Sequence, residues 1–303
     1  MSLPRAKFHT YFRGIILIGL SLFFLKLLLT GKISYFISPK LYPFLSITIG
    51  ILIIVGIIQI FIGTSDDEEM LCDCCEEHQP PKTTFRSVIL YSLFIIPIIS
   101  GFLFSNHTLG SSIAKNRQVQ LTTSSQDIKQ NRPSNVVNKQ ETQTNQQNNG
   151  SNKNTVPSST QQQYITQKEY DQLQHSIFQE NSIIIDDSKY VPTIGLIEEN
   201  FNKLIGKEIE TVGFVYREKN FSNNQIVVAR FVITCCIADA SVYGIMAKGD
   251  LAKFKNDTWV RLRGKLNKTT YQSSTIPILS VTSVQAIKEP AQPYVYDIGI
   301  KVD

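Results

Sequence analysis

Residues 45–62 read LSITIGILIIVGIIQIFI, a stretch without a single charged side chain. A helix that crosses the hydrocarbon core of a bilayer needs about 20 apolar residues, each rising about 1.5 Å along the axis. Because no water reaches that core, the helix must satisfy its backbone hydrogen bonds internally. We therefore predict a membrane-spanning helix from Leu41 to Ile62, which makes this chain a membrane protein.

Two more apolar segments flank this one. We predict further spans over Tyr11–Leu29 and Val88–Phe104, the second of which contains Pro97. The first segment follows a basic stretch and so resembles a signal peptide, but no small-residue cleavage site follows it and two further spans come after it. The sequence thus predicts a multi-pass α-helical region over residues 1–104, with the lipid bilayer as its surroundings.

The distribution of basic residues predicts the orientation of the spans. With three spans, the N-terminus and the loop 63–87 share one side of the membrane. That side carries Arg5, Lys7, Arg13, Lys82 and Arg86, against Lys32, Lys40, Lys115 and Arg117 on the other. Because Lys and Arg are enriched in cytoplasmic loops, we expect the N-terminus inside the cell and the C-terminal domain outside it.

A polar segment separates the membrane region from the rest of the chain. Residues 111–163 contain no aromatic side chain and consist mostly of Gln, Asn, Ser and Thr. Such a segment buries too little apolar surface to offset its chain entropy. We therefore predict a disordered linker over residues 105–163 and a globular domain over residues 164–303.

The loop between the second and third spans contains the sequence CDCCEEH. Cys72, Cys74, Cys75 and His78 offer thiolate and imidazole ligands, which zinc and other transition metals prefer. Their spacing is too tight for one closed tetrahedral structural site, so a labile or shared site is the better interpretation. Two alternatives remain: an acidic solvated connector, and a set of lipidated cysteines near the membrane.

The C-terminal domain has the pattern of a mainly β fold with flanking helices. A capping box at Thr166 and Glu169 predicts the start of a helix, and Gly206 predicts the end of another. Strands are expected over residues 208–216, 226–237, 242–247, 258–266 and 276–287, with a short helix over 249–254. Five strands with a helix between the third and fourth indicate an OB-like barrel.

The stretch FVITCCIADA, residues 231–240, contains the second candidate metal site. Cys235, Cys236 and Asp239 combine two thiols and a carboxylate within five residues. In a regular strand, adjacent side chains point to opposite faces, so one cysteine is expected inside and one outside. The alternatives are two small buried hydrophobic side chains, a redox role, or a vicinal disulfide.

The function classes that the sequence disfavours are catalysis and nucleic-acid binding. No Ser-His-Asp set, phosphate-binding loop, H-E-x-x-H motif or paired-carboxylate motif is present, so we expect no enzyme activity. The net charge of +5 is spread along the chain and forms no basic stripe of the kind that binds nucleic acid.

Three features together resemble a known family: the N-terminal spans, the CDCCEEH loop, and the block GFVYR…FVITCCIADA…WVRLRGKL…PYVYD. They are similar to the YcgQ-type family of bacterial membrane proteins, which are described as predicted permease subunits. The resemblance implies a multi-span permease partner of the YcgR type and a location in the bacterial plasma membrane. Members of the family often carry a His-rich loop where this chain has cysteines and only His78, so a metal role does not transfer directly.

We therefore expect a membrane-anchored accessory subunit of a permease that takes part in handling a metal ion, with zinc or another transition metal as the candidate. Three short spans form a poor conduit alone, so a transport role requires the partner. The alternative is an envelope-facing binding or metal-sensing protein without a transport role.

Overall fold

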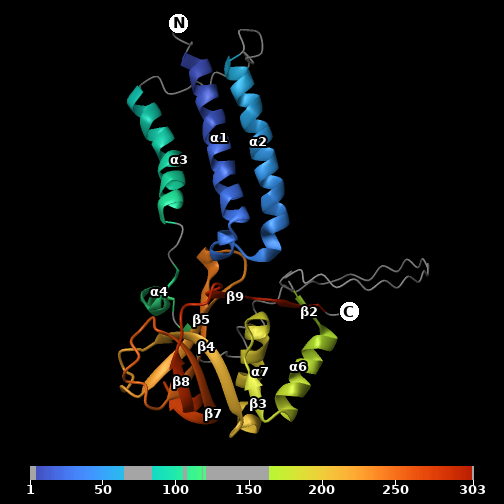
Figure 1. Ribbon diagram of the computed structural model, residues 1–303, viewed down its shortest axis with the longest axis vertical. Helices are drawn as coiled ribbons and strands as arrows, with labels where there is room; N and C mark the ends of the chain where they lie inside the picture. Colours follow the sequence, from blue (N-terminus) through green and yellow to red (C-terminus); the bar gives the residue numbers. More distant parts are fainter. Residues whose placement is uncertain (1–4, 65–83, 105–107, 118, 121–163, 302–303) are drawn as a thin grey trace, which may run out of the picture. The chain divides into compact units, whose positions relative to one another are not determined.

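The computed structural model describes residues 5–64, 84–104, 108–117, 119–120 and 164–301. The chain divides into two compact units, and Figure 1 labels most of their helices and strands. Unit 1 contains residues 1–109 together with residues 233–240, and unit 2 contains residues 110–232 together with residues 241–303.

Unit 1 is built on two long apolar helices, α1 (Arg5–Leu29) and α2 (Tyr42–Thr64). The connection between them holds two short 3-10 helices, η1 (Lys32–Tyr35) and η2 (Pro39–Leu41). By length and composition, Phe8–Leu29 and Pro39–Thr64 are each able to cross a membrane. These segments confirm two of the three predicted apolar helices.

The third predicted span forms α3 (Thr84–Phe104), which contains Pro97. Its apolar part, Phe85–Gly101, is shorter than those of the other two helices. Length and composition alone do not establish that α3 crosses a membrane, so the third span remains a prediction at this point.

Glycines bring α1 and α2 into close contact. A Cβ atom added to Gly56 would lie 3.2 Å from the carbonyl oxygen of Gly14, and one added to Gly63 would lie 2.8 Å from the backbone nitrogen of Tyr11. The later residue of α2 therefore meets the earlier residue of α1, so the two helices run antiparallel. Small residues that allow backbones to approach are typical of helix contacts in membranes.

Two contacts tie α3 to α1. His9 Nδ1 and Tyr91 Oη lie 2.8 Å apart, and both side chains are buried. Farther along both helices, a Cβ atom added to Gly101 would lie 2.5 Å from the ring of Phe23. The N-terminal part of α1 thus contacts the N-terminal part of α3, and the C-terminal parts of the two helices also meet, so α3 runs parallel to α1.

Unit 2 contains a mixed sheet whose five longest strands close on themselves. These strands are β4 (Glu208–Tyr216), β5 (Gln225–Ile233), β6 (Ser241–Lys248), β7 (Trp259–Tyr271) and β8 (Ser274–Ala286). β4 pairs antiparallel with β5 and β7, β5 with β6, and β7 with β8. The parallel pairing of β6 with β8 completes the ring. The prediction of a mainly β domain is confirmed.

Two helices accompany the ring, α6 (Gln167–Gln179) and α7 (Tyr190–Leu204), and η5 (Asp187–Lys189) precedes α7. The predicted capping box at the start of α6 is present, with both hydrogen bonds between Thr166 and Glu169. Gly206 follows α7 with a φ of 89°, a conformation that glycine adopts without steric cost. α7 contributes Ile194, Ile197 and Leu204 to the core between the helices and the ring.

The predicted helix over 249–254 is wrong, because this segment forms turns. The guanidinium of Arg217 explains the difference. It donates hydrogen bonds to the carbonyl oxygens of Leu251 and Phe254, at 3.0 and 3.2 Å. Carbonyls that accept from this side chain do not need the regular bonds of a helix.

Short elements extend unit 2 at its edges. They are α4 (Ser111–Asn116), β1 (Val119–Gln120), β3 (Ser182–Ile184) and β9 (Tyr294–Tyr296), and the separate pair β2 (Tyr164–Thr166) and β10 (Gly299–Lys301). β1 adds to β6, β3 to β4, and β9 to β5. β2 and β10 pair in parallel and join the start of the predicted domain to its end.

α4 and β1 lie in the range that was expected to be a disordered linker. The backbone N–H and hydroxyl of Ser111 both donate to the carboxylate of Asp257, and Ala114 is fully buried. The expectation is therefore wrong for residues 111–116, where a specific cap and a buried side chain hold the segment on unit 2. Residues 121–163 lie outside the described residues, so the linker prediction is untested there.

Candidate functional site

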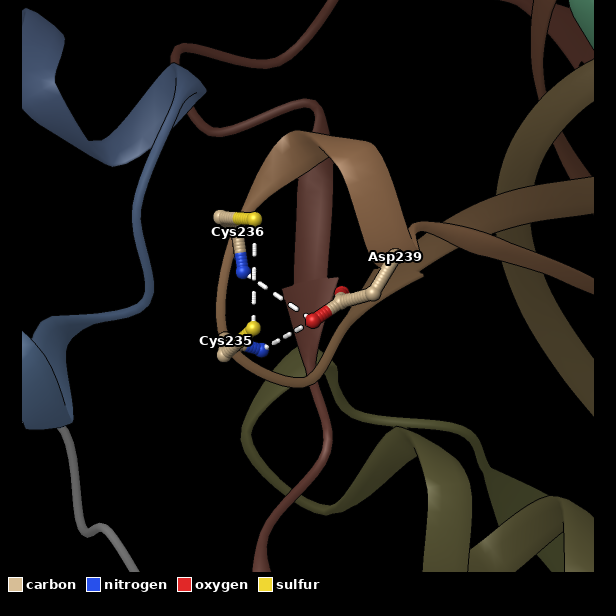
Figure 2. A group of neighbouring side chains, drawn as sticks. All are labelled: Cys235, Cys236 and Asp239. Carbon is tan, nitrogen blue, oxygen red and sulfur yellow. Dashed lines mark hydrogen bonds between the residues drawn. The ribbon is translucent and has the colours of Figure 1, made fainter.

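The loop that connects β5 to β6 brings together Cys235, Cys236 and Asp239. β5 ends at Ile233, and a short 3-10 helix, η6 (Ile237–Asp239), precedes β6. The ligand atoms of the three side chains all lie within 4.8 Å of one another. This is the second of the two metal sites that the sequence predicts, and the structure places its members side by side (Figure 2).

The carboxylate of Asp239 organises this loop. Its Oδ1 accepts a hydrogen bond from the backbone N–H of Thr234 at 3.0 Å. Its Oδ2 accepts from the backbone N–H groups of Cys235 and Cys236, at 2.7 and 3.2 Å. Three successive N–H groups thus turn toward one carboxylate, and the chain curls around it (Figure 2).

This curl places both sulfurs near each other. The Sγ atoms of Cys235 and Cys236 lie 3.8 Å apart. Cys235 is exposed, Cys236 is half-buried, and neither forms a disulfide. The expectation that the two side chains point to opposite faces of a strand is wrong, because the strand ends at Ile233 and the Asp239 carboxylate bends the backbone after it.

The same hydrogen bonds determine the charge of the site. The Asp239 carboxylate, which accepts from the Cys235 thiol, raises the pKa of Cys235 to about 11, and desolvation and the Cys236 thiol add to this rise. Burial alone would raise the pKa of Asp239, but hydrogen bonds from the Cys235 thiol and from the backbone N–H groups lower it below its usual value. Without a cation, the site therefore holds a protonated Cys235 beside an ionised Asp239.

The loop makes a second set of backbone contacts that the sequence did not suggest. Within unit 1, the N–H of Ser38 donates to the carbonyl oxygen of Cys235 at 2.9 Å, and the N–H of Ile237 donates to the carbonyl oxygen of Phe36 at 2.8 Å. Ile37 and Cys236 form an antiparallel β-bridge between these bonds. The connection between α1 and α2 therefore holds the backbone of both cysteines.

The other predicted metal ligands, Cys72, Cys74, Cys75 and His78, lie outside the described residues. The structure neither brings them together nor separates them, so that site remains a prediction.

Sequence reasoning missed a buried ion pair in unit 2. Arg230 is fully buried, and its guanidinium donates to both carboxylate oxygens of Asp187, at 2.8 and 3.0 Å. It also donates to the carbonyl oxygen of Gln292 at 3.2 Å and lies 5.2 Å from the ring centroid of Trp259. The signal was present, since Arg230 is the one charged residue in the strand QIVVARFVI. Its contacts link η5, β7 and the segment before β9 to β5 and indicate a structural role.

Two family models match the chain. The DUF1980 N-terminal domain matches residues 12–120, and the DUF1980 C-terminal domain matches residues 159–297. The first match covers α2, α3 and most of α1, and the second covers the closed ring of strands.

Two relatives are similar over different lengths. UPF0703 protein YcgQ of Bacillus subtilis is 28% identical over 309 residues, which cover 94% of this chain and 99% of that protein. A Streptococcus mutans protein named "Putative two-component membrane permease complex subunit" is 33% identical over 116 residues, which cover 38% of this chain and 42% of that protein.

Among solved structures, the chain is similar to a small single-stranded DNA-binding protein from Streptomyces coelicolor. The match covers 27% of this chain and 94% of that one, at 12% identity and a TM-score of 0.18. A TM-score this low establishes neither a shared fold nor a shared ligand. The two DUF1980 domains and the nearly full-length similarity to YcgQ, by contrast, agree with the order of the two units: the chain belongs to the YcgQ-type family.

Proposed function

We propose that this protein is a non-catalytic, membrane-anchored accessory subunit of a permease complex. Two apolar helices of membrane-spanning length anchor it, and a relative that is 33% identical over 116 residues is named as a subunit of such a complex. The partner would be a multi-span membrane protein of the YcgR type, as the family resemblance implies. The observation that carries the membrane anchoring is the pair of apolar helices α1 and α2, each long enough to cross a bilayer.

The β-bridge between Ile37 and Cys236, with the backbone bonds beside it, supports a third crossing of the membrane by α3. Residues 36–38 follow one crossing, so residues 235–237, which bond to them, must lie on that same side. A chain that continued after only two crossings would return to the opposite side. At about 1.5 Å per residue, the 21 residues of α3 extend about 31 Å, close to the thickness of a hydrocarbon core. The parallel course of α1 and α3 agrees with this topology.

The distribution of basic residues supports one orientation of these crossings. With three crossings, Arg5, Lys7 and Arg13 share the cytoplasmic side. The spans would then lie in the plasma membrane of a bacterium, with the C-terminal domain outside the cell. The loop 233–240, which holds Cys235, Cys236 and Asp239, would face the extracellular side together with the connection between α1 and α2.

The closed ring of β4, β5, β6, β8 and β7 supports an OB-like barrel as the architecture of the outer domain. Its single parallel pair, β6 with β8, closes an otherwise antiparallel sheet. Barrels of this kind commonly serve as binding modules, although a fold does not by itself specify a ligand.

We extend the proposal to the handling of a metal ion at the outer face. Cys235, Cys236 and Asp239 offer two thiols and a carboxylate within reach of one ion. Their loop is bonded to the membrane helices' connection, so an ion held there would be close to the membrane surface through which a permease would move it.

The accessory role is tested by purifying the tagged full-length chain from membranes in mild detergent and identifying what accompanies it. We expect a many-span membrane protein in a fixed ratio. If the chain emerges alone, or with an envelope polymer in place of a membrane protein, the accessory role is wrong and the envelope-binding alternative takes its place.

The topology is tested in whole cells. All five cysteines are replaced by serine, and Lys203→Cys places one thiol on an exposed position of unit 2. A membrane-impermeant maleimide should label this variant in intact cells. Labelling only after the cells are broken would contradict the extracellular placement.

A further inference from the structure

We propose that Cys235, Cys236 and Asp239 form an open, three-ligand site for a thiolate-preferring tetrahedral ion of the Zn²⁺ class, with the fourth position left to an exchangeable ligand. This inference deepens the metal-handling part of the proposed function and rests on it. It specifies the kind of ion and the kind of site, which the presence of cysteines alone does not.

The distance between the sulfurs carries the inference. Two thiolates on a tetrahedral zinc ion, with Zn–S bonds of about 2.3 Å, lie about 3.8 Å apart. The Sγ atoms of Cys235 and Cys236 lie 3.8 Å apart in the protein. Adjacent cysteines seldom present their sulfurs in this way, because in an extended strand they point to opposite faces. Here they are already placed for one ion.

Asp239 retains the capacity to act as the third ligand. A carboxylate has about four lone-pair positions, two on each oxygen. Its Oδ1 accepts the N–H of Thr234, and its Oδ2 accepts the N–H groups of Cys235 and Cys236. The carboxylate also accepts from the Cys235 thiol, and that lone pair becomes available to an ion when the thiol loses its proton on binding. Backbone N–H groups that bond to a ligating carboxylate fix its orientation, as the outer partners of metal ligands usually do.

The backbone of both cysteines is held from two directions, which lowers the cost of binding. Their N–H groups donate to Asp239, and the Cys235 carbonyl accepts from Ser38. Cys236 also pairs with Ile37 in the β-bridge. Because these bonds already order the loop, little conformational entropy remains to be lost when an ion binds.

The site is open rather than closed. Within the described part of the chain, the cluster has three members, and Cys235 is exposed. Structural zinc sites take four protein ligands, whereas sites with three keep a position for water or an incoming group. Two sulfurs select for soft or borderline ions over Mg²⁺ and Ca²⁺, which prefer oxygen. An open thiolate site suits an ion that is received and passed on.

The test uses the full-length protein in detergent with Cys72, Cys74 and Cys75 replaced by serine, so that the other cysteine cluster contributes no thiol. The probes are Zn²⁺, measured by equilibrium dialysis and elemental analysis, and Cd²⁺, measured by its thiolate charge-transfer absorbance. We expect one ion per chain, and Mg²⁺ at equal concentration should not compete.

Three variants locate the site. Cys235→Ala with Cys236→Ala should abolish the cadmium absorbance and weaken zinc binding at least about 100-fold, and Asp239→Asn should weaken zinc binding at least about tenfold. Loss of even an outer partner of a metal ligand costs about 10–100-fold in affinity. Asp250→Asn, an exposed carboxylate in the turn after β6, is the matched control and should bind as before. The fluorescence of Trp259, the only tryptophan, reports whether each variant keeps unit 2 folded.

Two results would overturn the inference: one zinc per chain that survives the double alanine variant, or no zinc binding by a folded protein with both thiols free. Neither depends on a partner. If zinc binds as expected but no permease accompanies the chain, the inference stands and the accessory role fails. If a permease accompanies the chain but the folded protein with both thiols free does not bind zinc, the accessory role stands and the inference fails.

Discussion

The two units use isoleucine in opposite ways. In α2, Ile47, Ile51 and Ile54 are each more than half exposed. In unit 2, Ile197, Ile209 and Ile226 are fully buried. The side chain is the same, so the difference lies in the surroundings that each unit requires. An outer surface of isoleucine is stable in lipid, whereas in water the same surface must be covered.

The interiors differ in the same sense. Unit 1 is held together where glycines let backbones touch, as at Gly14, Gly56 and Gly63. Unit 2 is held together by interlocking apolar side chains of its strands and of α7. Hydrophobic burial drives the second arrangement but not the first, since lipid tails are as apolar as isoleucine.

The largest expected difference comes from trimming one isoleucine in each unit. Ile209→Ala should lower the free energy of unfolding of unit 2 by about 4 kcal/mol, because β4 is paired on both sides and the resulting cavity cannot collapse. Ile54→Ala removes a similar volume from an exposed face of α2 and should leave unit 2 unchanged. Thermal unfolding of the full chain, followed by Trp259 fluorescence, measures both. Equal shifts would show that the two isoleucines do not differ as described.

The buried arginine provides the next test. Arg230→Met should destabilise unit 2 by about 3 kcal/mol, since it leaves Asp187 and the Gln292 carbonyl without their donor. The value is at the low end of the usual range because Asp187 is half exposed and water can replace part of the lost bond. Unfolding is again followed by Trp259 fluorescence, with the change in its wavelength recorded separately because Arg230 lies against that ring.

Arg263→Met is the matched control. Arg263 also pairs with a carboxylate, that of Glu210 at 2.6 Å, but its side chain is 55% exposed. Glu210 itself is buried, but Arg261 also donates to its carboxylate at 3.1 Å, so the variant leaves Glu210 paired and should cost about 1 kcal/mol. If this control is as costly as Arg230→Met, burial is not what distinguishes the two ion pairs.

Enlarging a glycine tests the interior of unit 1. Gly63→Val should weaken the contact between α1 and α2 by about 2 kcal/mol, because the new side chain would meet the backbone of Tyr11. Gly50→Val in the same helix has no atom within 4 Å of its Cβ position and should be tolerated. The fraction of monodisperse protein after heating in detergent reports the difference. Equal behaviour of the two variants would contradict glycine-mediated packing.

Local sequence signals predicted the elements of unit 2 well. The Thr166–Glu169 capping box and Gly206 marked helix ends, and alternating β-branched residues marked the five long strands. Such signals work because they depend on neighbours in the chain. The anchoring of α4 by Asp257 depends on a residue about 146 positions away, and no local pattern announced it. The OB-like assignment remains a proposal.

The candidate site was predicted in its members but not in its geometry. Composition identified Cys235, Cys236 and Asp239, because thiols and a carboxylate close in sequence are chemically distinctive. Their arrangement depends on backbone atoms, namely the N–H groups that bond to Asp239 and the bridge to residues 36–38. Every residue except proline has these backbone groups, so the residue types carried no sign of the bridge.

A smaller effect is expected at the end of α6. Lys207 Nζ donates to the carbonyl oxygens of Ile177, Phe178 and Glu180, at 2.8, 2.6 and 2.6 Å. These carbonyls lack partners within the helix, and a cation there also favours the helix dipole. Lys207→Met should therefore destabilise the last turn of α6 by about 1 kcal/mol, seen as faster amide hydrogen exchange there. Lys203→Met, an exposed control in α7, should leave that exchange unchanged.

The loop 233–240 follows a strand of unit 2 in sequence, yet it belongs to unit 1 by its contacts. The rate at which Cys235 is alkylated should report whether this loop keeps its conformation, with almost no change in the stability of the protein. The pKa of Cys235, raised to about 11 by Asp239, means that less thiolate is present at pH 8 than for a thiol at the ordinary value of 9.0. The thiolate fraction falls about 100-fold, but the intrinsic nucleophilicity rises with pKa and recovers most of one factor of ten. Alkylation by iodoacetamide, followed at Cys235 by peptide mass spectrometry, should therefore be about tenfold slower than that of an unperturbed thiol and should continue to accelerate as the pH rises toward 11.

Asp239→Asn removes the largest cause of the shift and should speed the reaction at pH 8, while the control Asp250→Asn should not. If Cys235 already reacts at its full rate at pH 8, the Asp239 carboxylate does not hold the thiol. The loop would then lack the curl on which its bridge to residues 36–38 and the geometry of its ligands depend.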